Sequence, residues 1–359
     1  MDFVQYDGVF VGNTSTGAFR VPYRITAPAN PVQANGAVVV EAPHFATGLG
    51  TLEFQMGRAF LLGRGFVHAG VGYSTTSFGP GWDQRILDPS VPGAYVLGGF
   101  ADGNGRTDDE IVADFAVALA NDSTARDMIG DVDGTYVTGF SDAANVVLRL
   151  VESGQADGVF ELAFPFTAEG PFDPQAALTN GKFQGKVVIV NSAVEDSTRL
   201  FDGDANQDRY RFYAVAGTPH VSDPLVPFFS NRTTPASWLP ALRAHFLQAH
   251  RWIRNGVAPP ASSVVDDPRL PFVELGEATF HIGFLGSYDQ VKSVTELGFP
   301  THRAYVKAFN AAVDANTRAG SISSDEASEM KRRANLCPPL TYTQTYRDHY
   351  DRFVAIRPC

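Results

Sequence analysis

The first candidates for chemistry in this sequence are the residues GFSDA at positions 139–143. A β-forming run, Tyr136 to Thr138, precedes them, and an apolar helical pattern follows at once. A serine held on so sharp a strand-to-helix turn has a strained backbone, so the residues two positions away must be small. Gly139 meets this requirement, and Ala143 replaces the commoner second glycine. The pattern predicts either a nucleophile, Ser141, or an ordinary hydroxyl between a strand and a helix.

A serine nucleophile needs a general base, and His220 is the best placed of the eight histidines. It follows a predicted strand, Tyr210 to Val215, on a turn of small residues, whereas the alternative interpretation is a histidine on a surface loop. His68 lies within a predicted strand and is interpreted as structural. His245 and His250 are five positions apart on a predicted helix, which is poor spacing for sharing a metal ion.

The third group should be a carboxylate that orients the imidazole of the base. The predicted strand from Lys186 to Val190 is followed by two adjacent acids, Glu195 and Asp196, between the serine and the histidine in chain order. Adjacent side chains usually point apart, so only one of them can serve. Glu195 is the first choice and Asp196 the reserve; the other interpretation is a solvated loop charge.

Negative charge on the attacked oxygen calls for backbone N–H donors. Asp142, at the start of the predicted helix behind Ser141, would supply one of them. The second should come from the loop after the apolar run Ala37 to Val40. Pro43 has no N–H group, so His44 or Phe45 would donate; His44 could instead line the pocket or end the strand.

No motif in the sequence calls for a cofactor or a metal ion. The run from Asp202 to Asp208 has the oxygen spacing of a calcium loop, but Gln207 replaces the turn glycine and Tyr213 the bidentate glutamate. We therefore expect an acidic surface loop there. No GxGxxG follows the first parallel strand, and no Walker-type loop exists, which disfavours a nucleotide site.

The elements needed to position these residues alternate between strands and helices. The first 30 residues read as antiparallel strands, and the chain then alternates through to a long helix at Ser237–Asn255. This pattern predicts an α/β fold, with a mostly parallel twisted sheet flanked by helices. The predicted elements, besides the opening strands, are strands at 37–40, 66–73, 135–138, 159–164, 186–190 and 210–215, and helices at 51–62, 107–119, 143–153 and 237–255.

Beyond residue 256 the alternation breaks at the run VAPPASS, a linker or crossing loop. We predict a catalytic domain over residues 1–256 and a C-terminal extension, mainly helical at its end, over 257–359. Ser323 and Glu326 form a capping box that opens a helix to about Ala334. The extension is expected to act as a cap or as a contact in a homo-oligomer.

Composition limits the classes of partner. The chain has 359 residues, 44% of them apolar and 19% charged, and a net charge of −11, so we expect no nucleic-acid partner. No apolar stretch approaches the ~20 residues that span a membrane, and the first ten residues do not resemble a signal peptide. Localisation is open: a disulfide between Cys337 and Cys359 would suggest secretion or the periplasm, and two free thiols the cytosol.

The motifs TGFSDAA, VVIVNSAVED, RFYAVAGTPH and HRWIRNGVAPPAS, in this order, resemble the α/β-hydrolase superfamily over roughly residues 30 to 256. The resemblance is closest to an esterase-like branch described only as "alpha/beta hydrolase domain". It implies Ser141 as nucleophile, Glu195 as acid and His220 as base, with hydrolysis of a small-molecule or polymeric ester and no cofactor. The loop Pro43-His44-Phe45 departs from the Asn-Arg-Gly-like loop typical of that branch.

Two other functions fit the same residues. A non-catalytic binding relative would keep the scaffold without using the serine. An acyltransferase would use the same triad but pass the acyl group to an alcohol or amine instead of water.

Overall fold

The computed structural model describes residues 2–14, 17–44, 50–73, 95–98, 109–195, 200, 205–221, 237–263, 269–288 and 292–336. The described chain groups into two compact units, which we treat separately. Unit 1 comprises residues 1–187 and 202–210, and unit 2 comprises residues 188–201 and 211–359. The predicted boundary at residue 257, and the role of the extension as a cap or an oligomer contact, stay predictions.

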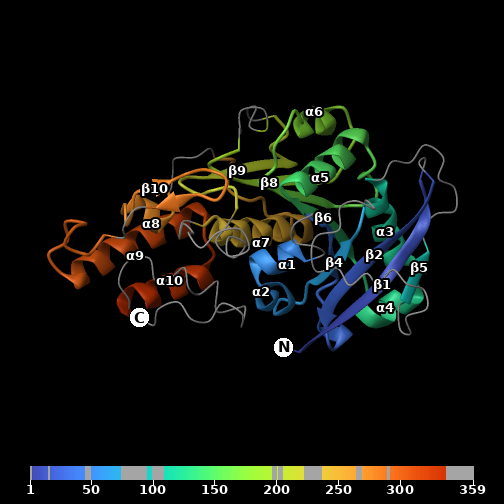
Figure 1. The fold of residues 1–359 in the computed structure, drawn as a ribbon, viewed down its shortest axis with the longest axis horizontal. Helices are drawn as coiled ribbons and strands as arrows, with labels where there is room; N and C mark the ends of the chain where they lie inside the picture. The colour runs from blue at the N-terminus through green and yellow to red at the C-terminus, as the bar shows by residue number, and fades with distance from the viewer. Residues whose placement is uncertain are drawn as a thin grey trace. The chain divides into compact units, whose positions relative to one another are not determined.

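Unit 1 is built around a mixed sheet, coloured from blue to green in Figure 1. Its strands follow the order β5-β1-β2-β4-β3-β6-β7. Their bounds are β1 Phe3–Thr14, β2 Gly17–Pro28, β3 Ala37–Ala42, β4 Val67–Val71, β5 Tyr95–Gly98, β6 Gly134–Phe140 and β7 Leu162–Phe166. The opening strands β1 and β2 are antiparallel, as predicted, and β4, β3, β6 and β7 run parallel to one another.

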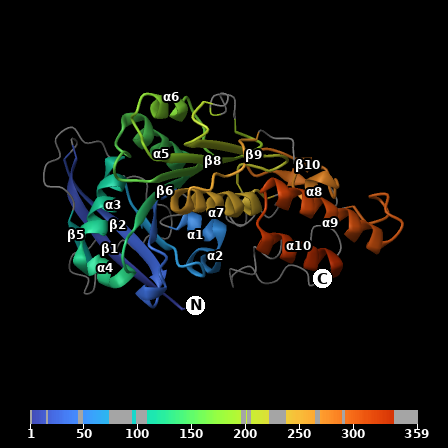
Figure 2. The ribbon, with the colours of Figure 1, turned by 180° about the vertical axis from the view of Figure 1, so that it is seen from behind.

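Helices cover this sheet, and both views show α3 and α4 lying together along β1, β2 and β5 (Figures 1 and 2). Helix α5 packs on β6 and β7, with α6 beside it. The bounds are η1 Pro31–Gln33, α1 Thr51–Met56, α2 Arg58–Leu62, α3 Glu110–Asn121, α4 Ser123–Ile129, α5 Asp142–Ser153 and α6 Pro174–Thr179. Seven buried residues line one side of α5, from Ala143 to Val151, as an amphipathic helix on a sheet requires.

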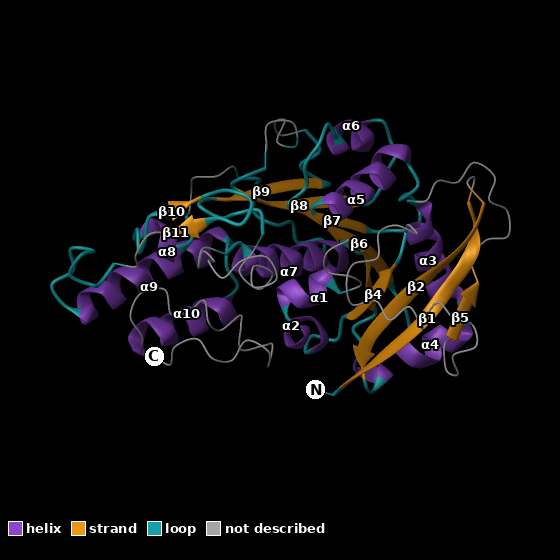
Figure 3. Cartoon of the chain, viewed as in Figure 1, coloured by secondary structure: helices purple, strands orange, loops and turns teal. Residues whose placement is uncertain are grey.

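Unit 2 contains the end of the strand series and the C-terminal elements. Strands β8 (Lys186–Ser192) and β9 (Tyr210–Val215) are neighbours in the strand order, and most of each strand belongs to unit 2. The remaining elements, drawn by type in Figure 3, are largely helical. They are α7 Leu239–Asn255, α8 Pro271–Glu274, β10 Phe280–His281, β11 Ser287–Tyr288, α9 His302–Ala319 and α10 Ser324–Leu336.

The segment expected to be a linker pairs with β9. Phe212 and Ala214 exchange backbone hydrogen bonds with Ser263 on either side of a parallel bridge at Tyr213. Arg211 donates to the carbonyl oxygen of Pro260, at 2.9 Å. Proline has no N–H group, so the backbone of this segment offers carbonyl acceptors but few donors to β9. Side chains such as that of Arg211 therefore make some of the hydrogen bonds between the segment and the strand.

The structure confirms the predicted α/β architecture, but β5, α4 and α6 were not predicted, and two predicted elements differ locally. The helix expected at 51–62 is two helices, because Gly57 adopts a φ of 84° between them. Strand β7 begins three residues later than predicted, after a turn in which Phe160 N–H bonds Ala156 O. Among the described residues no helix is both long and apolar enough to cross a membrane. Cys337 and Cys359 lie outside the described residues.

Candidate active site

The parallel strands of unit 1 end in register, and this brings candidate residues to one edge of the sheet. Ala42 of β3 lies opposite Gly139 of β6, which in turn lies opposite Pro165 of β7. The chain therefore leaves all three strands at the same level. Ser141 follows two residues after Gly139, and His44 two residues after Ala42. The carboxyl edge of a parallel sheet is where α/β proteins place their sites.

Ser141 has the strained backbone that the sequence pattern predicts. Its φ is 57° and its ψ is −120°, a region that residues with a side chain rarely adopt. Its N–H donates to the carbonyl oxygen of Phe166 at 3.1 Å, and its own carbonyl accepts from Ala144 N–H at 2.9 Å. These bonds to β7 and α5 hold the turn in place, so the strain of ~1–3 kcal/mol is supported by its surroundings.

The turn also explains the requirement for a small residue at position 139. A Cβ atom on Gly139 would lie 2.3 Å from the carbonyl oxygen of Ala143 and 2.9 Å from the nitrogen of Ala144. Both are backbone atoms that cannot move without opening the turn. Only glycine therefore allows β6 to turn so closely into α5.

His44 and Asp142 lie beside this turn. His44 Nε2 is 3.1 Å from Asp142 Oδ1, and the His44 ring packs 5.1 Å from the Phe140 ring, centroid to centroid. Asp142 is the first residue of α5, where a negative charge is favourable and where helix N–H groups point outward. The structure thus brings together three predicted residues, Ser141, Asp142 and His44. Phe45 lies outside the described residues.

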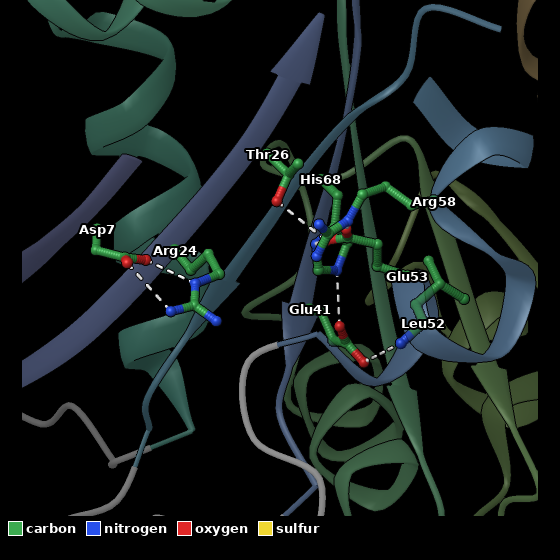
Figure 4. Close-up of polar contacts among 8 residues, drawn as sticks. All are labelled: Asp7, Arg24, Thr26, Glu41, Leu52, Glu53, Arg58 and His68. Carbon is green, nitrogen blue, oxygen red and sulfur yellow. Dashed lines mark hydrogen bonds and ion pairs between the residues drawn. The ribbon is translucent and has the colours of Figure 1, made fainter. Parts of the chain in front are cut away.

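A buried cluster fixes the start of the loop that carries His44 (Figure 4). Glu41, next to last in β3, accepts from Leu52 N–H at 2.8 Å and contacts His68 Nε2 at 2.7 Å. Glu53 accepts from the Thr26 hydroxyl at 3.0 Å and pairs with Arg58. Glu41 therefore ties the end of β3 to the first turn of α1, on the two sides of residues 43–50.

Unit 2 holds the predicted acid and base as a pair. His220 Nδ1 lies 2.6 Å from Glu195 Oε1, and both residues are almost fully buried. The other carboxylate oxygen, Oε2, accepts from the backbone N–H of Ser192 at 2.6 Å. An ionised carboxylate only accepts hydrogen bonds, so a neutral imidazole that bonds to Glu195 through Nδ1 carries its hydrogen there. This is the tautomer that a general base needs.

The turns that carry this pair are bonded to each other. Ala193 N–H, just after β8, donates to the carbonyl oxygen of Thr218 at 3.2 Å, and the Thr218 hydroxyl bonds Val215 O at 2.6 Å. The indole N–H of Trp238, a fully buried side chain, donates to Pro219 O at 3.1 Å. Asp196, the reserve acid, lies outside the described residues.

Two contributors were missed from the sequence. Phe166 holds the Ser141 turn through its carbonyl group, which no side-chain pattern reveals. Phe284 stacks its ring on the His220 imidazole, with centroids 4.9 Å apart and planes inclined by 19°. It lies in a hairpin whose strands have two residues each, too short to show any periodicity.

The sequence matches the model of one family, described as alpha/beta hydrolase domain, over residues 10–271. The chain therefore belongs to the α/β-hydrolase domain family. No curated protein matches it.

Solved structures with partial similarity to this chain include the following three proteins. A 2,6-dihydroxy-pseudo-oxynicotine hydrolase is 12% identical to this chain, with a TM-score of 0.34. The similarity covers 57% of this chain and 60% of that hydrolase, so this chain spans less than two thirds of the hydrolase. A dienelactone hydrolase-like promiscuous phosphotriesterase from metagenomic libraries is 20% identical (TM-score 0.41, coverage 63% and 87%). Est1E from Butyrivibrio proteoclasticus is 12% identical (TM-score 0.39, coverage 68% and 99%). None of these likenesses bears on the substrate.

Proposed function

We propose that the protein is a serine hydrolase that cleaves carboxylic esters through an acyl-enzyme. Ser141 is the nucleophile, His220 the general base and Glu195 the acid that orients it. The observation that carries the proposal is the strained backbone of Ser141 on the turn between β6 and α5. A protein gains no stability from such a conformation, which costs ~1–3 kcal/mol and is kept where a reactive side chain must be presented.

In the first half-reaction His220 Nε2 takes the proton of the Ser141 hydroxyl as its oxygen attacks the ester carbonyl. The tetrahedral oxyanion accepts hydrogen bonds from backbone N–H groups of Asp142 and of His44 or Phe45. When the intermediate collapses, the carbon–oxygen bond to the alcohol breaks, and the leaving oxygen takes the proton from His220. The acyl group stays on Ser141.

In the second half-reaction water replaces the alcohol. His220 removes a proton from that water, which attacks the acyl carbonyl, and the same N–H groups hold the second oxyanion. Collapse releases the carboxylic acid and returns the proton to Ser141. Throughout both steps Glu195 keeps the hydrogen of the imidazole on Nδ1 and stabilises the imidazolium that forms twice per turnover.

Covalent labelling tests the assignment of the nucleophile. A fluorophosphonate should modify the wild-type protein on the peptide that contains Ser141, and Ser141→Ala should abolish labelling. Hydrolysis of p-nitrophenyl acetate should fall by about 10⁵- to 10⁶-fold in the same variant. Ser153→Ala, on the exposed end of α5, is the matched control and should label like the wild type. Equal hydrolysis by the wild type and Ser141→Ala would refute the proposal.

Product analysis separates hydrolysis from acyl transfer. With an alcohol or amine acceptor present, a hydrolase releases mainly the free acid, whereas an acyltransferase yields mainly the new ester or amide. A non-catalytic relative would give neither labelling nor products.

A further inference from the structure

A short hairpin of unit 2 is built onto the turn that carries His220. It consists of β10 and β11, which pair Phe280 with Tyr288 and His281 with Ser287. The N–H of His220 donates to Gly283 O at 3.2 Å, and the N–H of Val221 to Phe284 O at 2.9 Å. The hairpin tip is therefore fixed to the backbone of the candidate base itself.

Packing beneath the hairpin holds it in place. The ring of Phe280 packs edge to face on Phe272 of α8, with centroids 6.0 Å apart, and Phe272 is fully buried. Val273, in the same short helix, lies against Gly217. A Cβ atom added to Gly217 would come within 3.0 Å of the Val273 side chain. Gly217, at a φ of 73°, starts the turn that leads to His220. Helix α8 and the hairpin thus support one turn together.

The tip presents apolar side chains to solvent. Phe284 is 60% exposed and Ile282 is 55% exposed, although the other face of the Phe284 ring stacks on the His220 imidazole. Exposing two large apolar side chains costs free energy, since apolar area is favourably removed from water. An apolar group resting on Phe284 would lie next to the general base.

We propose that Phe284, with Ile282, forms the binding surface for an apolar alcohol group of the ester substrate. The inference rests on the proposed function. His220 must donate its proton to the leaving alkoxide oxygen, so the group attached to that oxygen is the part of the ester that lies beside the imidazole. The surface therefore selects the alcohol part of the substrate, and esters of bulky apolar alcohols are the preferred class.

The position of the hairpin in the chain agrees with a role in specificity. The family match ends at residue 271, before β10 begins at Phe280. The segment that contacts the candidate base therefore lies outside the part of the chain that the family model describes. Loops and appended segments commonly set specificity on a shared scaffold.

Two esters with one acyl group test the proposal. Ethyl butanoate and cyclohexylmethyl butanoate release alkoxides of similar basicity, so the ratio of their kcat/KM values reports on binding of the apolar alcohol. The wild type should favour the cyclohexylmethyl ester. Phe284→Ala should lower kcat/KM for that ester about 10-fold, mainly through KM, and change the ethyl ester less than about 3-fold.

Two control variants show whether the loss is specific to the apolar ring of Phe284. Phe284→Leu keeps an apolar side chain and should retain most of the preference. Val32→Ala removes an exposed apolar side chain from unit 1 and should leave both esters unchanged. An equal fall in kcat for both esters in Phe284→Ala would show that the ring only supports His220, and the proposal would fail.

Binding without turnover gives an independent readout. Calorimetric titration with cyclohexylmethyl butanoate compares the Ser141→Ala variant with the double variant Ser141→Ala/Phe284→Ala. The double variant should bind the ester about 10-fold more weakly. If Ser141 proved dispensable for hydrolysis, the proposed function would fail, and the same titration with the non-hydrolysable butyl cyclohexylmethyl ether would still decide the inference. Equal affinity in the two variants would overturn it. A dimer that Phe284→Ala dissociates would also overturn it, because the surface would then join two copies of the chain.

Discussion

Two buried glutamate–histidine pairs in this protein have nearly the same geometry and different surroundings. In unit 1 Glu41 lies 2.7 Å from His68, and in unit 2 Glu195 lies 2.6 Å from His220. His68 is the second residue of β4, with another carboxylate, Glu53, 3.6 Å from its Nδ1. His220 is on a turn after β9, with an exposed aromatic ring on its face.

The contrast teaches that a short carboxylate–imidazole contact does not by itself indicate catalysis. Both ring nitrogens of His68 face carboxylates inside the protein, so neither is available to a substrate. At His220 the Glu195 carboxylate contacts Nδ1, and the residue follows the carboxyl end of a strand. The first pair links the end of β3 to the start of α1 in unit 1, and the second is proposed to transfer protons.

The largest expected effect follows from Glu195→Gln. An amide at this position can accept from Nδ1 or donate to it, so the imidazole loses its fixed tautomer and the imidazolium loses its counter-charge. We expect kcat to fall by about 10⁴-fold, with little change in the melting temperature. Ester hydrolysis and thermal unfolding of the same preparation measure the two quantities. If kcat fell less than 10-fold, the acid would have to be another residue, and Asp196 would be the first to test.

Glu41→Gln should have the opposite profile. It leaves His68 and Glu53 buried beside an amide, so the free energy of unfolding should fall by about 3–5 kcal/mol. Because the oxygen of the new amide could still accept from Leu52 N–H, the folded fraction should keep kcat/KM within about 5-fold of the wild type. Urea unfolding, with activity measured on the refolded fraction, provides the test. Loss of activity without loss of stability would make this pair functional and remove the contrast.

Another buried histidine, His245, tests the importance of the carboxylate, because its partner is an amide. Its Nδ1 lies 2.9 Å from the amide oxygen of Gln248, and its ring stacks 3.5 Å from Tyr213. Burial lowers the pKa of His245 from its ordinary 6.5 to about 4, and the Gln248 bond opposes the shift only partly.

The sign of the pH dependence follows from this lowered pKa. The unfolded chain binds a proton at His245 below about pH 6.5, and the folded protein only below about pH 4. Stability is therefore fully present above pH 6.5 and falls as the pH drops to 4, by on the order of 3 kcal/mol. Urea unfolding of the wild type and of His245→Phe at pH 7 and pH 4.5 isolates the contribution of His245 to the pH dependence of the free energy of unfolding. An identical pH dependence in both proteins would contradict the assignment.

The smallest effect is expected at the surface. Arg24 and Asp7 lie opposite each other on β1 and β2 and form a two-bonded ion pair that is about one third exposed (Figure 4). Water and salt screen such a pair, so Asp7→Asn should lower the free energy of unfolding by no more than ~1 kcal/mol. Urea unfolding at low and high salt checks this value. A loss as large as that of Glu41→Gln would show that burial does not separate the two pairs.

The amino-acid sequence by itself determined the alternation of strands and helices, the antiparallel opening strands and the turn at Ser141. These features rest on local causes: hydrophobic periodicity, and the need for Gly139 where β6 turns into α5. It also identified Glu195 and His220 as candidates, because each follows a strand of a mostly parallel sheet. The start of β7 differs from the prediction by three residues, since helix and strand ends are the least certain part of such a prediction, and the break at Gly57 was not predicted.

Only the tertiary structure decided which of the buried charges are paired. Glu41, Glu53 and His68 are 12 to 27 positions apart, and their contacts depend on the register of β3 with β4 and the docking of α1. Likewise, Phe284 and His220 are 64 positions apart, and only the folded hairpin stacks the two rings. Contacts at such separations depend on how strands and loops close in space, which nearest-neighbour patterns in a sequence do not encode.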